Sequence, residues 1–273
     1  MNRRPTLAAL LFAGALLAPV AGQTQTPASP RALAPAQAPL AISAEEQADA
    51  KIVKDILISP TRTPQQLQAL RTVLDHAPAR YPTIEPKGAH VLVRGVTPEQ
   101  IAALSLAAGL QAAGSGQNKT VYVGATFNTY PMAAFLLGSY AVGRRQPDEA
   151  LAWLDKGLAL QPDNLYLVTE KGAALALLGR PADALALYDA TLALGDRTGD
   201  VKSQARLRRG RGWALIELGR LDEAEADYKQ SLTLEPDHGG ALRELKYIAE
   251  SRAGVAHNQP VQLYTAPEAR AIK

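Results

Sequence analysis

The residues most able to do chemistry in this sequence are few and scattered. The four histidines, His76, His90, His238 and His257, show no metal-ligand spacing, and the chain has no cysteine. No serine stands in a G-x-S-x-G nucleophile motif. The lack of cysteine also excludes disulfides, thiolate metal sites and lipid attachment through a thiol. We therefore expect no metal, no cofactor and no enzymatic activity.

One loop has the composition of a phosphate-binding site but not its pattern. The segment "AGSGQNKT" contains the dipeptide Lys119-Thr120 that such a loop requires. Asn118 replaces the glycine before the lysine, however, and Ala113 replaces the first glycine. The expected order of elements is also helix-loop-strand, whereas a phosphate loop joins a strand to a helix. The segment is therefore predicted to be a turn.

The first residues have the composition of a secretory signal. Arg3 and Arg4 precede an apolar run from Leu7 to Leu17, and small residues lead to a cleavage site after Gly22. The run is shorter than the roughly 20 apolar residues of a transmembrane helix, although an uncleaved anchor is the alternative. We predict a signal peptide over 1–22 and a periplasmic or secreted location, with no stable membrane insertion after cleavage.

Residues 23–43 and the overall charge give less information about function. Residues 23–43 are rich in proline and alanine and predict a disordered linker. The net charge is +3, but residues 1–22 contain two of the 29 basic residues and none of the 26 acidic ones. The remainder is close to neutral at +1, so a nucleic-acid partner is not expected from the total charge.

Residues 44–130 predict a helical region that also contains two short strands or, alternatively, irregular structure. Ser43 with Glu46, and Thr63 with Gln66, are capping-box pairs that satisfy free amide groups at helix starts. Short β-branched runs flank the third predicted helix. The expected helices are 44–58, 64–76 and 98–113, and the expected strands are 90–95 and 119–127.

A repeated pattern of small and large residues fills the second half of the chain. Three alanines are separated by 34 and 40 residues; each has a glycine twelve residues before it, a large residue four after it and a leucine eight after it. Small residues let two antiparallel helices approach closely, and the larger residue fills the space beside the contact. The glycine and alanine of each copy are Gly138 and Ala150, Gly172 and Ala184, and Gly212 and Ala224.

The pattern resembles the tetratricopeptide repeat, a 34-residue helix-turn-helix unit. The resemblance implies a mostly α-helical solenoid over 131–253, with a tail over 254–273. Within it, the repeats are 131–164, 165–198 and 205–238, followed by a capping helix over 239–253 that covers the last apolar face. The extra residues 199–204 either extend the first helix of the third repeat or form a loop.

The resemblance also implies a concave groove that is lined by the first helix of each repeat. The positions that face such a groove include Met132, Phe135, Tyr166, Arg206, Arg209, Trp213, Arg243 and Tyr247. Arginine and aromatic side chains often dominate interfaces, so an acidic or aromatic peptide segment is the expected ligand. The alternative is that the arginines are solvated and pair with nearby glutamates. Phe135 and Ser139 replace the lysine and asparagine of the family's carboxylate clamp, so a heat-shock-protein tail is not expected.

These features predict a non-enzymatic scaffold of the cell envelope that binds a protein or peptide segment. Two alternatives remain. One is an enzyme with its active site in 44–127 that uses the repeats to recruit substrate. The other is a binder of an anionic polymer through the arginines of 206–211, for which affinity would fall steeply with added salt.

Overall fold

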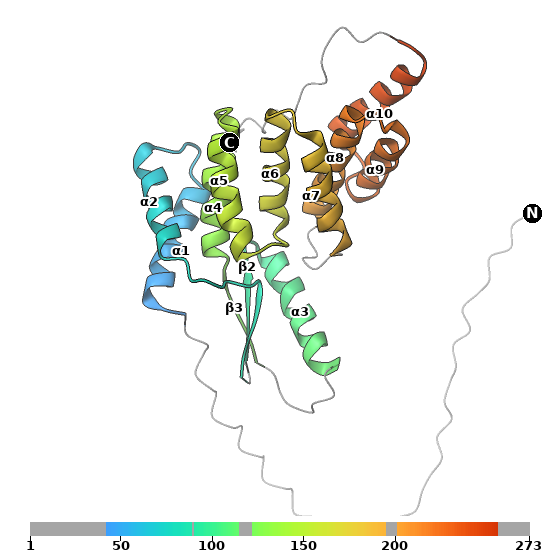
Figure 1. Cartoon of the computed structure of the whole chain (residues 1–273). Coiled ribbons are helices and arrows are strands. Elements are labelled where there is room, and N and C mark those ends of the chain that lie inside the picture. Colours follow the sequence, from blue (N-terminus) through green and yellow to red (C-terminus); the bar gives the residue numbers. More distant parts are fainter. Residues whose placement is uncertain (1–41, 89, 115–121, 195–200, 256–273) are drawn as a thin grey trace, which may run out of the picture. The chain divides into compact units, whose positions relative to one another are not determined.

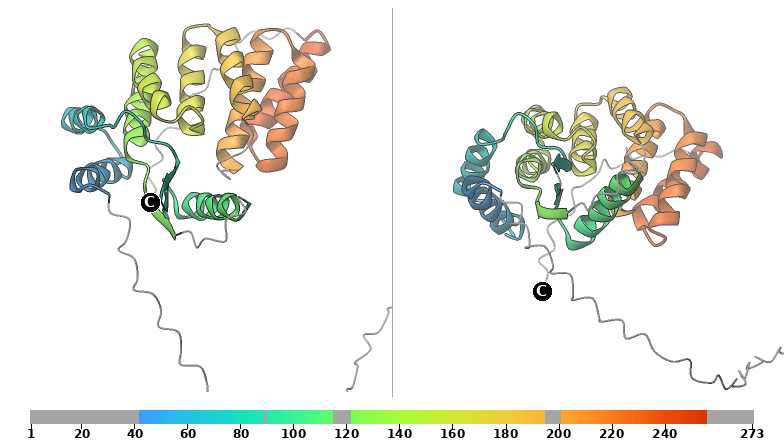
Figure 2. Two further views of the ribbon diagram at one scale, coloured as in Figure 1. Left: turned by 60° about the horizontal axis from the view of Figure 1, so that its bottom comes forward. Right: turned by 90° about the horizontal axis from the view of Figure 1, so that it is seen from below.

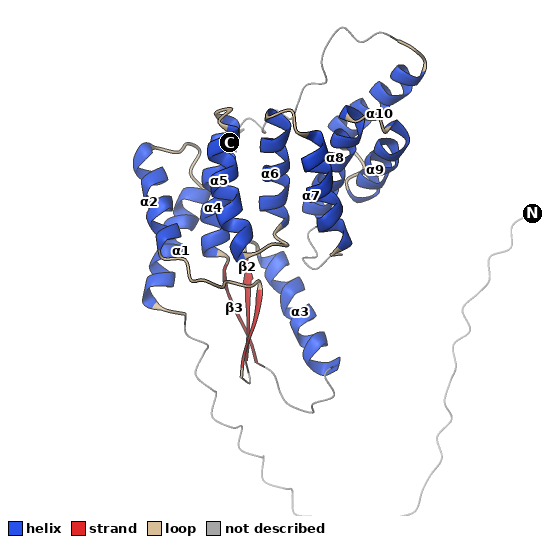
Figure 3. Cartoon of the chain, viewed as in Figure 1, coloured by secondary structure: helices blue, strands red, loops and turns tan. Residues whose placement is uncertain are grey.

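A computed structural model describes residues 42–88, 90–114, 122–194 and 201–255 (Figure 1). The predicted signal peptide, most of the predicted linker and residues 256–273 lie outside the described residues. The described part is mostly helical, with three short strands (Figure 3). Its elements are α1 (Ala44–Leu57), α2 (Pro64–Asp75), β1 (Ile84–Lys87), β2 (His90–Gly95), α3 (Pro98–Gly114), β3 (Tyr122–Phe127), α4 (Thr129–Gly143), α5 (Pro147–Leu160), α6 (Leu165–Leu177), α7 (Pro181–Ala193), α8 (Val201–Glu217), α9 (Leu221–Leu234) and α10 (Gly239–Arg252).

Helices α1 and α2 form a hairpin that packs against α4. Ser43 caps α1 through the amide of Glu46, and Thr63 and Gln66 form a complete capping box at α2. Buried apolar residues of both helices, including Val53 and Leu70, share one core with the apolar face of α4. The hairpin therefore adds a helix pair in front of the first predicted repeat.

The α1–α2 contact contains an ion pair that should make stability depend on pH. Asp49 is buried, and its carboxylate lies 3.0 Å from Nδ1 of His76. The hydrogen bond to Asp49 raises the pKa of His76 above its ordinary value. A pKa raised in the folded state gives stability that is complete below the ordinary pKa and is lost as pH rises through the folded-state pKa.

We therefore expect a higher melting temperature at about pH 6 than at about pH 8, measured by circular dichroism. Replacing His76 with glutamine should remove most of this difference, because the amide does not titrate. His90→Gln is the matched control, since His90 lies on β2 away from this pair. Equal pH dependence in the native protein and His76→Gln would contradict the assignment.

A three-stranded sheet and one helix lie between the hairpin and the repeats in the sequence. The strand order is β1-β2-β3; β1 pairs antiparallel with β2, and β3 pairs parallel with β2 through the crossover helix α3. Val93, Leu104 and Ala108 form the small core between the sheet and α3. The strands predicted on either side of α3 are thus present, and β1 is an additional strand that was not predicted.

The repeat helices follow one another as the pairs α4–α5, α6–α7 and α8–α9, and α10 packs on α9 (Figure 2). The alanines at 150, 184 and 224 have no exposed surface. A Cβ added at Gly138 would lie 2.5 Å from Cγ of Leu154, and one at Gly212 would lie 2.8 Å from Cε2 of Tyr228. Each repeat glycine therefore makes room for the large side chain of the second helix, and the buried alanine accompanies that contact.

The helix ends also follow a repeated geometry. Gly179 and Gly219 take positive φ angles of 65° and 73° before α7 and α9. Arg145 occupies the corresponding place before α5 with φ of 56°, a conformation that L-residues adopt at a cost of about 1 kcal/mol. Of the extra residues before the third repeat, 201–204 form the first turn of α8, which begins at Val201, and the others lie outside the described residues.

Candidate functional site

The apolar part of the predicted groove lies on α4 and α6. Phe135 and Tyr166 are partly buried, and their rings meet edge to face with centroids 5.8 Å apart. This is a favourable aromatic geometry, so the two rings hold each other in place. Met132, in contrast, is only 3% exposed and packs in the core shared with α1 and α2. Of the three predicted ligand contacts in this part, Met132 is not accessible.

The arginines of α8 contact carboxylates from neighbouring elements. Arg206 donates to Glu170 of α6. Arg209 donates from Nη1 to Glu235, the residue after α9, at 2.6 Å. Both guanidinium groups are mostly buried, with side-chain exposures of 23% and 13%. These contacts agree with the alternative that the arginines pair with acidic residues of the same chain.

Two further arginines of α8 pair with carboxylates of neighbouring helices. Asp227 of α9 is 3% exposed; it accepts from Arg211 at 2.7 Å and lies 3.4 Å from Arg208. Arg211 also donates to Asp189 of α7 at 2.6 Å. Burial raises the pKa of Asp227, and the two arginines oppose that shift. Arg208 is therefore a structural contact within the third repeat, and Arg211 joins the second repeat to the third.

Positive charge gathers where α10 begins. His238 caps α10 by accepting from the amide of Ala241 at 3.1 Å. Burial lowers the pKa of His238, and the charges of Arg209 and Arg243 lower it further. Arg243 is exposed, and no carboxylate of the described residues lies within ion-pair distance of it. Arg243 of α10 is therefore more accessible than Arg206 and Arg209 of α8.

Trp213 and Tyr247 contribute aromatic surface beside these charges. Both are partly buried and pack against the core of the second and third repeats. The indole N–H of Trp213 is buried, and no acceptor within the described ranges bonds to it. A buried N–H without an acceptor costs free energy, so this indole N–H is an unfavourable feature of the described structure.

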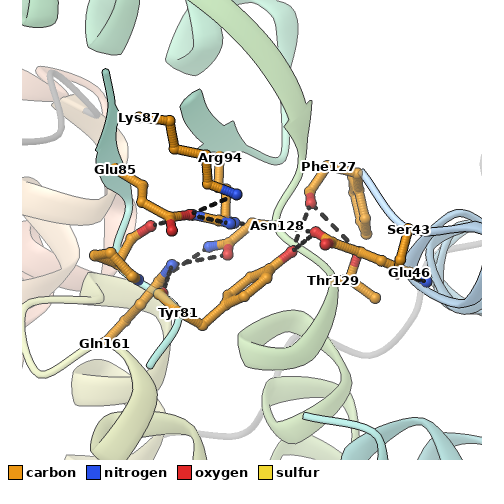
Figure 4. A network of polar contacts seen from close by, with 11 residues as sticks. Ser43, Glu46, Tyr81, Glu85, Lys87, Arg94, Phe127, Asn128, Thr129 and Gln161 are labelled. Carbon is orange, nitrogen blue, oxygen red and sulfur yellow. Dashed lines mark hydrogen bonds and ion pairs between the residues drawn. The ribbon is translucent and has the colours of Figure 1, made fainter. Parts of the chain in front are cut away.

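A buried polar network that was not predicted joins the N-terminal region to the first repeat (Figure 4). The side-chain amides of Asn128 and Gln161 bond to each other in both directions at 2.9 Å, and Gln161 also donates to the backbone oxygen of Tyr81 at 3.0 Å. Asn164 donates to Gln161 and caps α6. The partners are 33 and 80 residues apart, so no local pattern could have indicated the network.

The network borders a small pocket between α3, α4 and the start of α6. The pocket is lined by Thr83, Gln100, Asn128, Gln161, Asp163, Asn164, Leu165 and Tyr166. These are mainly amides and hydroxyls that already cap helices or bond to one another. No group of three or more His, Cys, Asp or Glu side chains suited to a metal ion occurs in the described ranges. None of the helices described there combines the length and apolar character that crossing a membrane requires.

A family comparison matches part of the repeat region. The family model described as tetratricopeptide repeat matches residues 164–235, about a quarter of the chain. The match covers α6 to α9, where the glycines at 172 and 212 face Tyr188 and Tyr228.

The similarity to curated relatives is limited to part of each chain. RNA polymerase II-associated protein 3 of Homo sapiens is 33% identical over 113 residues, which are 41% of this chain and 16% of that protein. The proteins of the same name from Rattus norvegicus and Mus musculus match equally. The similarity therefore spans about a sixth of the length of these curated relatives.

Two solved structures resemble the repeat region. The first tetratricopeptide repeat domain of human RPAP3 is 28% identical, covers 46% of this chain and 94% of its own, and gives a TM-score of 0.42. The first such domain of Spaghetti (RPAP3), solved with the HSP90 peptide SRMEEVD, is 28% identical, covers 45% and 93%, and gives 0.41.

The predicted periplasmic or secreted location is wrong. The named relatives are eukaryotic proteins associated with RNA polymerase II, which is not a component of a bacterial cell envelope. Residues 1–22, for which a signal peptide was predicted, lie outside the described residues.

The helix pairs, the glycine contacts and the family match thus agree on the architecture. The described chain is a mostly helical solenoid, and its segment 164–235 matches the tetratricopeptide-repeat family.

Proposed function

We propose that the chain is a non-enzymatic adaptor that binds a segment of a partner protein on the face formed by α4, α6, α8 and α10. The observation that carries the proposal is the arrangement of partly exposed aromatic side chains along these successive first helices. Phe135 and Tyr166 stand on the first two, Trp213 on the third and Tyr247 on the cap. Aromatic anchors of this kind supply much of the binding energy at protein interfaces.

The charges of this face favour a peptide with few carboxylates over a long anionic polymer. Arg206 and Arg209 already have carboxylate partners, so a polyanion would have to displace Glu170 and Glu235 to reach them. Arg243 is exposed and can pair with one carboxylate of a ligand. We therefore propose an aromatic or apolar segment that contains an acidic residue placed to reach Arg243.

Peptide selection from a random display library would test this function, followed by fluorescence anisotropy with the enriched peptides. Trp213→Ala should weaken their binding by about thirtyfold, which corresponds to ~2 kcal/mol. Arg243→Glu should weaken binding as well, because it reverses the charge that meets the ligand's carboxylate. Arg220→Ala is the matched control: this exposed arginine pairs with Glu223 at the start of α9, outside the proposed face.

Circular dichroism must show native helicity for each variant before affinities are compared. Selection of peptides that bind Trp213→Ala and Arg243→Glu as tightly as the native chain would rule out the proposed face. Enrichment of peptides without acidic residues would rule out the proposed ligand chemistry.

A further inference from the structure

The two edges of the small sheet differ in how they are protected against pairing. The outer strand β1 is four residues long and contains Glu85, Pro86 and Lys87. Proline has no N–H to donate to a neighbouring strand, and charged side chains disfavour such a strand. This edge is therefore protected against pairing. The opposite edge is formed by β3, which is six residues long, "YVGATF", with no proline and no charge.

The β3 edge is also exposed. Tyr122 and Val123 have 43% and 39% of their surface accessible, and Ala125 is exposed as well. In the described ranges β3 pairs with β2 alone, on its inner side. The carbonyl of Phe127 is occupied by the hydroxyls of Tyr81 and Thr129, so the accessible edge runs from Tyr122 to Thr126. An unprotected edge of this length is a ready template for another strand.

We infer that β3 pairs with β3 of a second copy of this chain, antiparallel about a two-fold axis, and extends the sheet from three strands to six. The charge pattern favours this occupant. Two-fold pairing places identical side chains near one another, so charged edges would repel, but the β3 edge has no charge to repel. A partner strand rich in charges would have to desolvate them against Val123 and Ala125 without gaining an ion pair.

The geometry of the sheet supports the same pairing. His90 and Tyr122 are register partners whose rings lie 5.4 Å apart on one face, so Val123 and Ala125 point to the other face, where α3 packs. A second copy at this edge would cover those two apolar side chains. Its main-chain groups would satisfy the outer amides and carbonyls of β3, which no strand among the described residues pairs with.

Sedimentation velocity of the full chain over a concentration series tests the inference. We expect a reversible dimer, and Val123→Lys should raise its dissociation constant at least tenfold because two like charges would meet across the axis. Val123→Thr is the matched control, since it keeps the β-branched shape without charge and should dimerise nearly as well. A thermal melt of each variant confirms folding.

Cysteine cross-linking gives an independent measurement, because the chain contains no cysteine. Ala125→Cys should cross-link into dimers with a short bismaleimide, whereas Ala102→Cys, on the exposed side of α3, should not. Hydrogen exchange should show that the β3 amides become protected as concentration rises.

Two outcomes would overturn the pairing. One is a chain that remains monomeric up to about 100 µM, a concentration that reveals even weak dimers. The other is a dimer that Val123→Lys leaves intact but Leu106→Lys/Leu110→Lys dissolves, because those two leucines are each 65% exposed on α3 and form a separate apolar surface.

Discussion

Replacing Gly172 with alanine is expected to lower the free energy of unfolding by about 3 kcal/mol or more, which is at the upper end for overpacking a core. A Cβ at this position would overlap the hydroxyl and Cζ of Tyr188 and lie 2.9 Å from Cε1. Tyr188 cannot easily move away, because its ring also meets Gly210 of α8, where an added Cβ would lie 2.6 Å from Cζ. The ring is thus wedged between a glycine of α6 and a glycine of α8. Urea denaturation would measure the loss.

A double-mutant cycle isolates this contact. In a Tyr188→Ala background, Gly172→Ala should be neutral or stabilising by up to about 1 kcal/mol, because the clash is gone and alanine favours a helix more than glycine does. Gly109→Ala is the matched control for the helix propensity alone, since nothing lies within 4 Å of an added Cβ there. An equal cost of Gly172→Ala in both backgrounds would show that the contact with Tyr188 is not the reason why position 172 excludes a larger residue.

The repeat packing was predictable because each contact joins residues at a fixed offset in the sequence. Each repeat glycine faces the large residue sixteen positions later, as Gly138 faces Leu154, so periodicity alone reveals the pairing. The contact between repeats, where Gly210 meets Tyr188, falls outside that pattern and was not predicted. Strand β1 was also missed, because its proline and its two charged residues are unfavourable in a strand, and its pairing with β2 stabilises it in spite of them.

The helix that carries Arg206 and Arg209 was predictable from the repeat pattern, but the ion pairs of these arginines were not. Arg206 and Arg209 stand on the first helix of the third repeat as expected, yet their carboxylate partners lie 36 and 26 residues away on other elements. No spacing rule links residues so far apart, so the sequence could not distinguish a free cationic patch from a set of internal ion pairs. Helix stacking decides between these alternatives, and it leaves Arg243 as the exposed member.

The buried arginine of β2 contacts β1 and the segment before it, and Tyr81 of that segment in turn contacts α1. Arg94 is 3% exposed; it donates to the backbone oxygen of Pro82 at 2.8 Å and to Glu85 at 2.6 Å, and its guanidinium lies 4.0 Å from the ring centroid of Tyr81 (Figure 4). Tyr81 donates to Glu46 of α1 at 2.6 Å. Burial, together with Glu46, raises the pKa of Tyr81 well above its ordinary value, so the phenol stays a donor.

Arg94→Met is therefore expected to cost about 3 kcal/mol, because it preserves the side-chain volume while leaving Glu85 and the Pro82 carbonyl without their donor. Glu85 is 30% exposed, which allows water to solvate part of the lost interaction and keeps the cost at the lower end of that range. Arg94→Lys should cost less, since it retains the charge but not the two-pronged geometry. Arg80→Met, at an exposed arginine close by in the sequence, should stay within about 0.5 kcal/mol of the native chain.

Hydrogen exchange separates a local role of Arg94 from a global one. In Arg94→Met, amides of β1, β2 and β3 should exchange faster, whereas those of α8 and α9 should keep their protection, because the third repeat makes none of the contacts that Arg94 supports. Uniform loss of protection across the chain would mean that the sheet and the repeats unfold as one unit. In that case the polar network around Gln161 couples the N-terminal region to the solenoid more strongly than the local contacts of Arg94 require.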